Sequence, residues 1–126
     1  MSTKSNSLKE KLTKNFSEFS QLSDYSFLNC LKADPQSTKD GNDHKPRSVY
    51  SGHYVPVLPT AIPDPEYICH SKKLFKELGL SSDLTRDKNF CRFFSGDISV
   101  ANYPMSPVGW ATGYCLLYTS DAADDC

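Results

Sequence analysis

Hydrophobic positions near the start of the chain recur at helical spacing. Steps of four, four, three and three residues separate Leu8, Leu12, Phe16, Phe19 and Leu22. Such spacing places the five side chains on one face of a helix. We therefore expect residues 1–23 to be an N-terminal amphipathic helix that acts as a targeting or docking segment.

The charge of this segment leaves two interpretations open. Lysines outnumber acids over residues 1–23, as in a mitochondrial targeting helix, yet the first arginine of the chain is Arg47. Transit peptides favour arginine and avoid acids, so a plain docking helix is the stronger interpretation. The expected localisation is accordingly mitochondrial or cytoplasmic.

The middle of the chain alternates between loop and extended patterns. Residues 32–47 have no apolar periodicity and contain Asp-Pro and Asp-Gly turn signals, so they predict a loop. The run from Tyr54 to Pro65 holds four of the eight prolines, which predicts an extended, semi-rigid segment. Such a segment could bind an aromatic groove as a polyproline ligand, but the apolar residues between the prolines favour packing within the chain. Those residues are Val55, Val57, Leu58 and Ile62.

Two short helices are predicted after this segment. Glu66 to His70 is a strand candidate, and Ser71 is suited to cap a helix over residues 72–78 that ends at Gly79. Its apolar face consists of Leu74, Phe75 and Leu78.

A second helix is expected to begin near Ser82 or Asp87 and to end before Gly96. We expect its three phenylalanines to lie in the core. They are Phe90, Phe93 and Phe94. Residues 97–107 predict irregular structure, because a Tyr-Pro-Met-Ser-Pro run discourages a helix.

Composition and charge narrow the class of protein. The chain has 126 residues, of which 38% are hydrophobic, and its mean hydropathy is -0.50. It has no apolar run long enough to span a bilayer, so we expect no membrane partner. With 14 Lys and Arg against 15 Asp and Glu, the balanced charge also argues against nucleic acid as the partner. RNA binding by Arg86, Lys88 and Arg92 beside the phenylalanines remains a weaker alternative.

The sequence offers few residues that could form a metal site or a catalytic site. The five cysteines never form a C-x-x-C pair, so we expect reduced thiols. They are Cys30, Cys69, Cys91, Cys115 and Cys126. The histidines His44, His53 and His70 show no zinc spacing, and the adjacent Cys69 and His70 would point to opposite faces of a strand.

Dispersed glycines predict no phosphate loop, and Ser51-Gly52-His53 lacks an orienting partner for nucleophilic catalysis. Turn and capping roles account for the carboxylates Asp34, Asp64, Asp83, Asp87 and Asp97. The sequence therefore assigns no catalytic, cofactor-binding or metal-binding residue.

Several short motifs occur together in a characteristic order. They are Ala33-Asp34-Pro35, Pro46-Arg47-x-Val49, Tyr54-x-x-Val57-x-Pro59-Thr60, Pro63-x-Pro65, Ser71-x-x-Leu74-x-x-x-Leu78-Gly79-Leu80, Phe93-Phe94-Ser95-Gly96-Asp97, Pro107, and Trp110-Ala111-Thr112 followed by Tyr114. Each motif is weak alone, but their order and spacing resemble the opening segments of the selenoprotein O family. The resemblance covers residues 24–114.

The resemblance implies a protein-kinase-like fold and transfer of AMP from ATP to Ser, Thr or Tyr hydroxyls of protein substrates. Such chemistry needs a glycine-rich loop, a nucleotide-facing lysine, and Asn and Asp ligands for Mg²⁺. In the family these follow the matched portion, so no catalytic or ATP-binding residue transfers to this chain. We expect an α+β chain that is the incomplete N-terminal part of a kinase-like fold, with short helices and extended proline-rich segments, and inactive by itself.

The resemblance ends abruptly after Tyr114. Codons for Cys115 to Asp124 can be written as a common transposase adapter from sequencing libraries, so we expect residues 115–126 to be a translated adapter tail. Residues 24–114 would then form the family segment. The alternative is a genuine acidic tail, and the alternative function is a small non-catalytic interaction module that uses the proline-rich segment 54–65.

Overall fold

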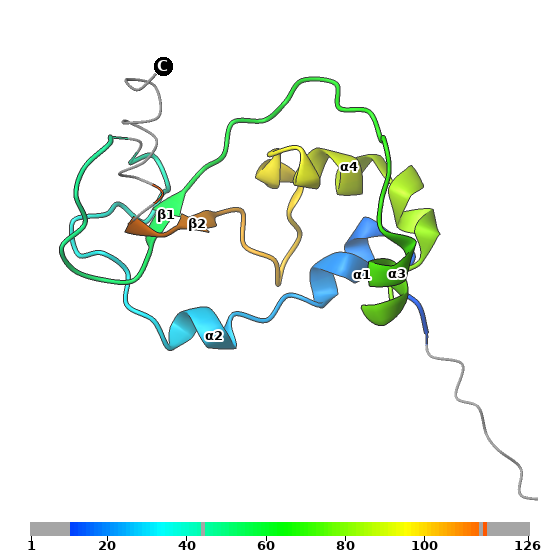
Figure 1. The fold of residues 1–126 in the computed structure, drawn as a ribbon, viewed down its shortest axis with the longest axis horizontal. Helices are drawn as coiled ribbons and strands as arrows, with labels where there is room; N and C mark the ends of the chain where they lie inside the picture. Colours follow the sequence, from blue (N-terminus) through cyan, green and yellow to red (C-terminus); the bar gives the residue numbers. More distant parts are fainter. Residues whose placement is uncertain (1–10, 44, 114, 116–126) are drawn as a thin grey trace, which may run out of the picture.

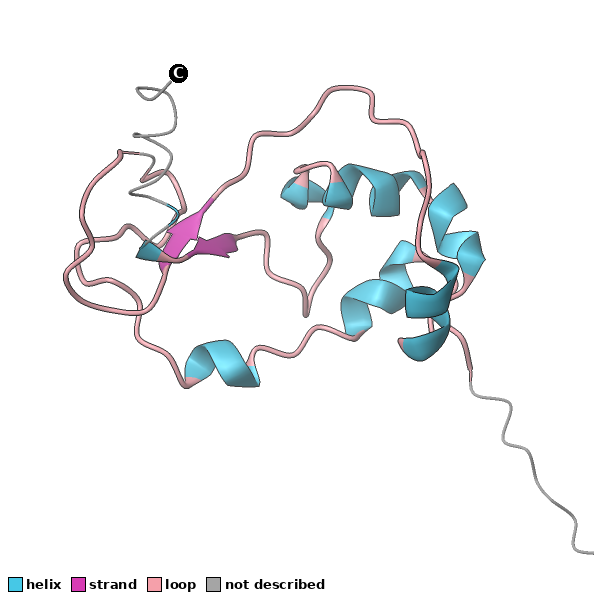
Figure 2. Cartoon of the chain, in the orientation of Figure 1, coloured by secondary structure: helices cyan, strands magenta, loops and turns pink. Residues whose placement is uncertain are grey.

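Most of the short helices lie toward one end of the fold, and the small sheet lies toward the other (Figures 1 and 2). The computed structural model describes residues 11–43, 45–113 and 115. Along the chain the elements are α1 (Phe16–Gln21), α2 (Ser26–Asn29), β1 (Val55–Val57), α3 (Lys72–Glu77), η1 (Ser82–Arg86), α4 (Lys88–Phe94), η2 (Ile98–Val100) and β2 (Gly109–Ala111). This mixture of helices and an antiparallel pair of strands agrees with the expected α+β class.

The helix expected over residues 1–23 is, within the described residues 11–23, shorter than the apolar spacing indicates. α1 begins only at Phe16, where the Asn15 side chain accepts a hydrogen bond from the Glu18 backbone N–H. Before it, the backbone of Thr13 pairs with the chain around Leu80, which commits this stretch to extended structure. Leu12 is therefore exposed rather than on a helix face, and Leu8 lies outside the described residues.

Side-chain caps start α3 and α4 at positions that the sequence predicts. The Ser71 hydroxyl accepts from the Leu74 N–H at 3.2 Å, and the Asp87 carboxylate accepts from the Asn89 N–H at 2.9 Å. α3 ends before Gly79, whose φ of +69° is a conformation that glycine adopts without strain. The predicted starts of α3 and α4 are confirmed.

The strand expected over Glu66–His70 is wrong. These residues form no strand, because within residues 11–43, 45–113 and 115 no strand lies beside them to pair with their backbone. The segment runs instead along α4, where the Cys91 thiol donates to the carbonyl of Pro65 at 3.6 Å. Ile68 is consequently 88% exposed.

The proline-rich segment begins in the sheet. β1 pairs with β2 in antiparallel register, with Val55 opposite Ala111, Pro56 opposite Trp110 and Val57 opposite Gly109. Val55 is fully buried, whereas Ile62 is 62% exposed. Packing of this segment within the chain is therefore confirmed for its first part and wrong for Ile62, which lies beyond the sheet.

The core is small and aromatic at the helical end. Phe16 packs against Phe93 with ring centroids 5.6 Å apart, and Leu84 of η1 is completely buried. Phe90 and Phe93 are half-buried, as expected of core residues, but Phe94 is 64% exposed. Its place in the core is therefore corrected: Phe94 shares a helix face with Phe90 and Phe93, but the described part of the chain leaves its part of that face uncovered.

The loop predictions hold where the structure describes them. Residues 32–43 and 45–47 contain no helix or named strand, and residues 97–107 are irregular apart from the single turn η2. Within the described part of the chain, no helix is long and apolar enough to cross a membrane. Residues 116–126 of the expected tail lie outside the described residues.

Candidate functional site

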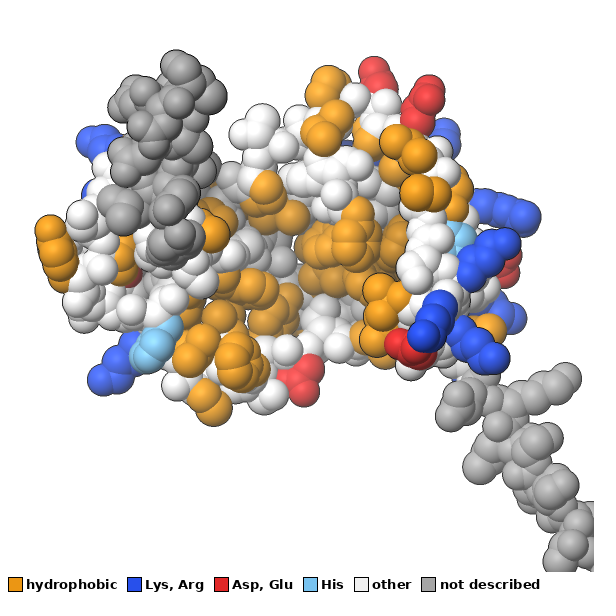
Figure 3. Space-filling model, in the orientation of Figure 1, with side chains coloured by type: hydrophobic (Ala, Val, Ile, Leu, Met, Phe, Trp, Pro, Cys, Tyr) orange, Lys and Arg blue, Asp and Glu red, His pale blue; other side chains and the backbone are white. Residues whose placement is uncertain are grey.

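An apolar hollow opens at the helical end, between α3, α4 and the segment that precedes α3. We call it the aromatic groove, and its volume is about 500 Å³. Its main apolar lining residues are Phe19, Tyr67, Ile68, Leu74, Phe75, Leu78, Leu80, Phe90 and Phe94. Figure 3 shows hydrophobic side chains gathered over this end of the molecule. Three of the lining residues are more than half exposed, Ile68, Leu78 and Phe94, so the groove offers apolar surface to a partner.

Ring contacts fix the walls of the groove. Phe90 packs on Phe94 with centroids 4.8 Å apart and meets Phe19 edge to face at 5.5 Å. Phe75 contacts Phe90 from the α3 side at 6.1 Å. Such arrangements suit the quadrupoles of aromatic rings, so these contacts hold the aromatic part of the groove wall in place.

A polar chain borders the groove. The Tyr67 hydroxyl lies 2.6 Å from Nδ1 of His70, and Nε2 of His70 lies 3.3 Å from the Ser82 hydroxyl. The His70 ring also packs on Phe75, with centroids 4.3 Å apart. This chain ties the extended segment to the start of η1 and holds Tyr67 in place.

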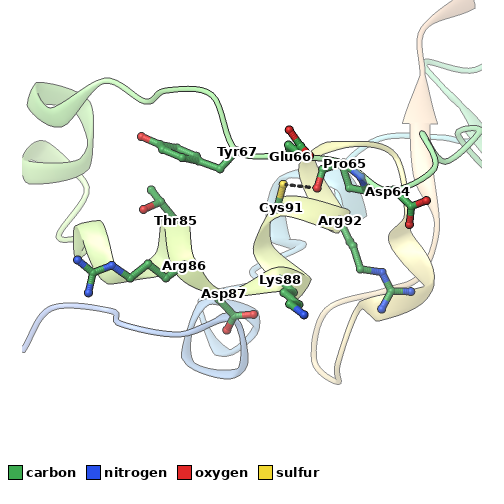
Figure 4. A pocket seen from close by; sticks show the side chains of 10 residues that line it. All are labelled: Asp64, Pro65, Glu66, Tyr67, Thr85, Arg86, Asp87, Lys88, Cys91 and Arg92. Carbon is green, nitrogen blue, oxygen red and sulfur yellow. Dashed lines mark hydrogen bonds between the residues drawn. The ribbon is translucent and has the colours of Figure 1, made fainter.

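A charged cleft adjoins the groove and shares Glu66, Tyr67, Thr85 and Cys91 with it (Figure 4). The cleft has a volume of about 420 Å³. Its charged lining consists of Asp64, Glu66, Arg86, Asp87, Lys88 and Arg92. Acids and bases therefore occur in equal number, and the cleft has no net charge to attract an ion of one sign.

Two of these charged groups, Asp87 and Arg92, already make hydrogen bonds within the chain. The Asp87 carboxylate accepts from the backbone N–H of Asn89 and, with its other oxygen, from that of Phe16 at 2.8 Å. Arg92 donates to Asp97 through Nη2 at 2.7 Å. The pKa of Asp97 is lowered, first by the Ser99 side chain that donates to its carboxylate and then by Arg92.

A buried ion pair lies at the sheet end. Asp34 is 4% exposed, and its Oδ2 atom lies 2.5 Å from Nη1 of Arg47, which also reaches Asp43 at 3.1 Å. The pKa of Asp34 is lowered, first by the hydrogen bond from the Gln36 N–H and then by Arg47. This pair closes the loop of residues 32–47, so Asp34 has the turn role predicted for it together with a salt bridge that the sequence did not indicate.

The other residues singled out by the sequence are dispersed. Cys30 and Cys69 are exposed and Cys91 is half-buried, and none of the three forms a disulfide. His53 bonds with the Lys32 N–H through Nδ1 at 3.1 Å. Among the residues that the structure describes, no three potential metal ligands lie together. Cys126 and His44 lie outside the described residues.

The aromatic groove is the feature that sequence reasoning missed. Helical spacing of Phe90 and Phe94 identified an apolar face but not whether the chain itself covers that face. The sequence signal that could have found it is the number of apolar residues in and just before α3, which lie close to the apolar face of α4 along the chain.

Comparison with known proteins adds no relative. No family model matches the chain, and neither the curated proteins nor the solved structures contain a match.

Proposed function

We propose that this chain is the front segment of a kinase-like protein adenylyltransferase similar to selenoprotein O, and that it braces the nucleotide-binding lobe. In that role the segment carries no catalytic residue itself. ATP and Mg²⁺ would bind to the portion of the enzyme that the resemblance places after residue 114, and the substrates would be hydroxyl side chains of proteins. The chain alone would then be inactive.

The observation that carries the proposal is that the motifs of the resemblance contact one another in space. Asp34 from the first motif pairs with Arg47 from the second. A Cβ atom at Gly96, where φ is +93°, would lie 2.7 Å from the carbonyl oxygen of Thr60, so two further motifs approach as closely as a glycine permits. Motifs that support one folded arrangement are expected of a segment inherited as a unit.

The sheet joins the Tyr54–Thr60 motif to the Trp110–Thr112 motif. Val57 lies opposite Gly109, and the adjacent Trp110 lies opposite Pro56. The chain folds around these contacts but leaves the aromatic groove open. An uncovered apolar surface of this kind supports a bracing role, because it requires a larger body to bury it.

The first test is the sequence of the source transcript or locus across the Tyr114 codon, obtained with primers outside the suspected adapter. The proposal expects an open frame that continues into a glycine-rich loop, a nucleotide-facing lysine, and Asn and Asp metal ligands. If the locus encodes Cys115 to Cys126 followed by a stop, the proposal is wrong.

A second test addresses the inactivity of the chain. The purified chain is incubated with ATP labelled on the α-phosphate, Mg²⁺ and a mixture of acceptor proteins, and label on protein is measured. We expect no transfer above a control without chain. AMP transfer that depends on this chain would refute the bracing role and would place an active site within the chain.

The exposure of the second half of the proline-rich segment favours one other function, a non-catalytic interaction module. Strand β1 occupies Val55–Val57, but Pro59 and Pro63 are exposed and flank the exposed Ile62. This function requires a self-sufficient folded unit. Cooperative thermal unfolding of the chain together with binding to an aromatic-groove domain would favour it, whereas non-cooperative melting would favour the bracing role.

A further inference from the structure

A serine, a histidine and a tyrosine form one hydrogen-bonded row beside the aromatic groove. The Ser82 hydroxyl lies 3.3 Å from Nε2 of His70, and Nδ1 of the same ring lies 2.6 Å from the Tyr67 hydroxyl. A hydroxyl nucleophile, an imidazole base and a third group that orients the base are arranged in this order in serine hydrolases. Separations slightly above 3.2 Å between nucleophile and base are common in such sites before substrate binds.

The fold holds the base and the nucleophile by separate contacts. The His70 ring packs on the Phe75 ring of α3, with centroids 4.3 Å apart. The carbonyl of Ser82 accepts a hydrogen bond from the Thr85 hydroxyl at 2.7 Å. The meeting of Ser82 with His70 therefore does not depend on the bond between them alone.

The row is accessible from outside and adjoins an apolar pocket. Ser82 is exposed, His70 is half-buried, and Tyr67 is 49% exposed. Tyr67 and His70 also line the aromatic groove, whose volume is about 500 Å³. A small molecule whose carbonyl group lies at Ser82 has an apolar pocket next to it for the rest of its acyl chain.

We propose that Ser82 is the nucleophile of a site that hydrolyses small carboxylic esters, with the apolar acyl chain of the ester in the aromatic groove. His70 is the general base. Tyr67 is a positioning residue: its oxygen accepts from Nδ1–H of His70, which leaves Nε2 to accept from the Ser82 hydroxyl. The site belongs to the chain with its groove open, as the structure describes it. The proposal does not rest on the transferase proposal, because ester hydrolysis needs neither ATP nor Mg²⁺.

The reaction proceeds in two balanced steps. The Ser82 oxygen attacks the carbonyl carbon of the ester while Nε2 of His70 takes the hydroxyl proton, and the alcohol leaves with that proton as the ester C–O bond breaks. Water then attacks the acyl-serine, and His70 transfers a proton from the water to the departing Ser82 oxygen. The carboxylic acid is released, so the sum is ester and water converted to acid and alcohol.

The test uses the whole chain with p-nitrophenyl acetate and p-nitrophenyl hexanoate, and absorbance follows the release of nitrophenolate. We expect saturable turnover above a blank without protein. The kcat/KM value should be at least about tenfold higher for the hexanoate, because its additional methylene groups enter the groove. After an acid quench, mass spectrometry of peptides should locate the acyl group on Ser82.

Three variants separate the roles in the row. Ser82→Ala should lower the rate to that of the blank, and His70→Gln should lower it about 100-fold. Tyr67→Phe keeps the ring in the groove and loses only the hydroxyl, so kcat should fall about tenfold while KM is unchanged. A residue that only stabilised the groove would instead raise KM.

Ser51→Ala is the matched control. Like Ser82, Ser51 is exposed, and a histidine lies two residues after it in the sequence. The ring of that histidine, His53, accepts from the Lys32 N–H through Nδ1 instead. We expect the wild-type rate from this variant, and far-UV circular dichroism checks that all four variants keep their helices.

Three outcomes would overturn the proposal. The first is a wild-type rate no greater than that of the blank. The second is activity that Ser82→Ala retains and His70→Gln loses, because the histidine would then attack the ester directly. The third is an acyl group found only on residues other than Ser82, a result that is measured on the wild type and so stands even where a variant does not fold.

Discussion

Burial should decide the cost of removing a phenylalanine ring from this chain. The perturbation is a matched pair of variants, Phe16→Ala and Phe94→Ala, which delete the same atoms at opposite extremes of exposure. The Phe16 side chain is 1% exposed, whereas that of Phe94 is 64% exposed. Both residues contact Phe93, with centroids 5.6 and 5.3 Å apart, so aromatic contacts alone do not separate the two variants.

The magnitudes follow from that difference. Truncation of a fully buried phenylalanine costs about 3–5 kcal/mol, because it removes apolar burial and leaves a cavity. Phe94 loses ring contacts and part of its burial, for which about 1 kcal/mol is expected. Native domains are stable by only about 5–15 kcal/mol, so Phe16→Ala removes much of the stability of a chain with this small a core.

Urea unfolding supplies the assay. Far-UV circular dichroism follows the helices, and Trp110 fluorescence follows the sheet end. Coincident transitions would justify a two-state treatment. The expected order is wild type, then Phe94→Ala slightly below it, then Phe16→Ala far below both. Equal destabilisation by the two variants would refute the inference that the α4 side of the aromatic groove is uncovered.

Three further predictions concern the backbone, a cap and a carboxylate. Gly96→Ala should cost about 2 kcal/mol or more in urea unfolding, because its Cβ would lie 2.7 Å from the Thr60 carbonyl oxygen; Gly79→Ala, with positive φ but nothing within 4 Å, should cost about 1 kcal/mol and serves as the control. Ser71→Ala should lower stability by about 1 kcal/mol through loss of the α3 cap, and no effect on the urea midpoint would contradict the capping assignment. Since the folded pKa of Asp34 is lowered, its contribution is present above the ordinary value of 3.8 and is lost as the pH falls below that value toward the folded pKa. Asp34→Asn should therefore show a smaller fall in urea midpoint between about pH 7 and pH 3 than wild type, and an unchanged fall would refute the assignment.

Local chemistry explains why some elements could be predicted. The hydroxyl of Ser71 and the carboxylate of Asp87 reach backbone N–H groups only two or three residues ahead, so neighbouring residues suffice to place the starts of α3 and α4. A glycine after a short apolar helix likewise ends it by its own conformational freedom. The starts of α3 and α4 and the positions of the loops can therefore be predicted from the sequence.

Contacts between distant residues decided the rest. Pairing of Thr13 with the chain at Leu80 kept α1 from extending back over residues 11–15, although the apolar period allowed it. In the part of the chain that the structure describes, no strand lies beside Glu66–His70, so that segment did not become one. The aromatic groove also depends on contacts between distant residues, because apolar spacing identifies a face of α4 but not what covers that face.

The sequence by itself thus determined the helix caps, the loops and the apolar faces, because these depend on residues within a turn or two of each other. Only the tertiary structure decided which faces are buried and that Asp34 meets Arg47. Each of those outcomes depends on which distant segment comes to lie alongside, and periodicity along one segment contains no information about its neighbour in space.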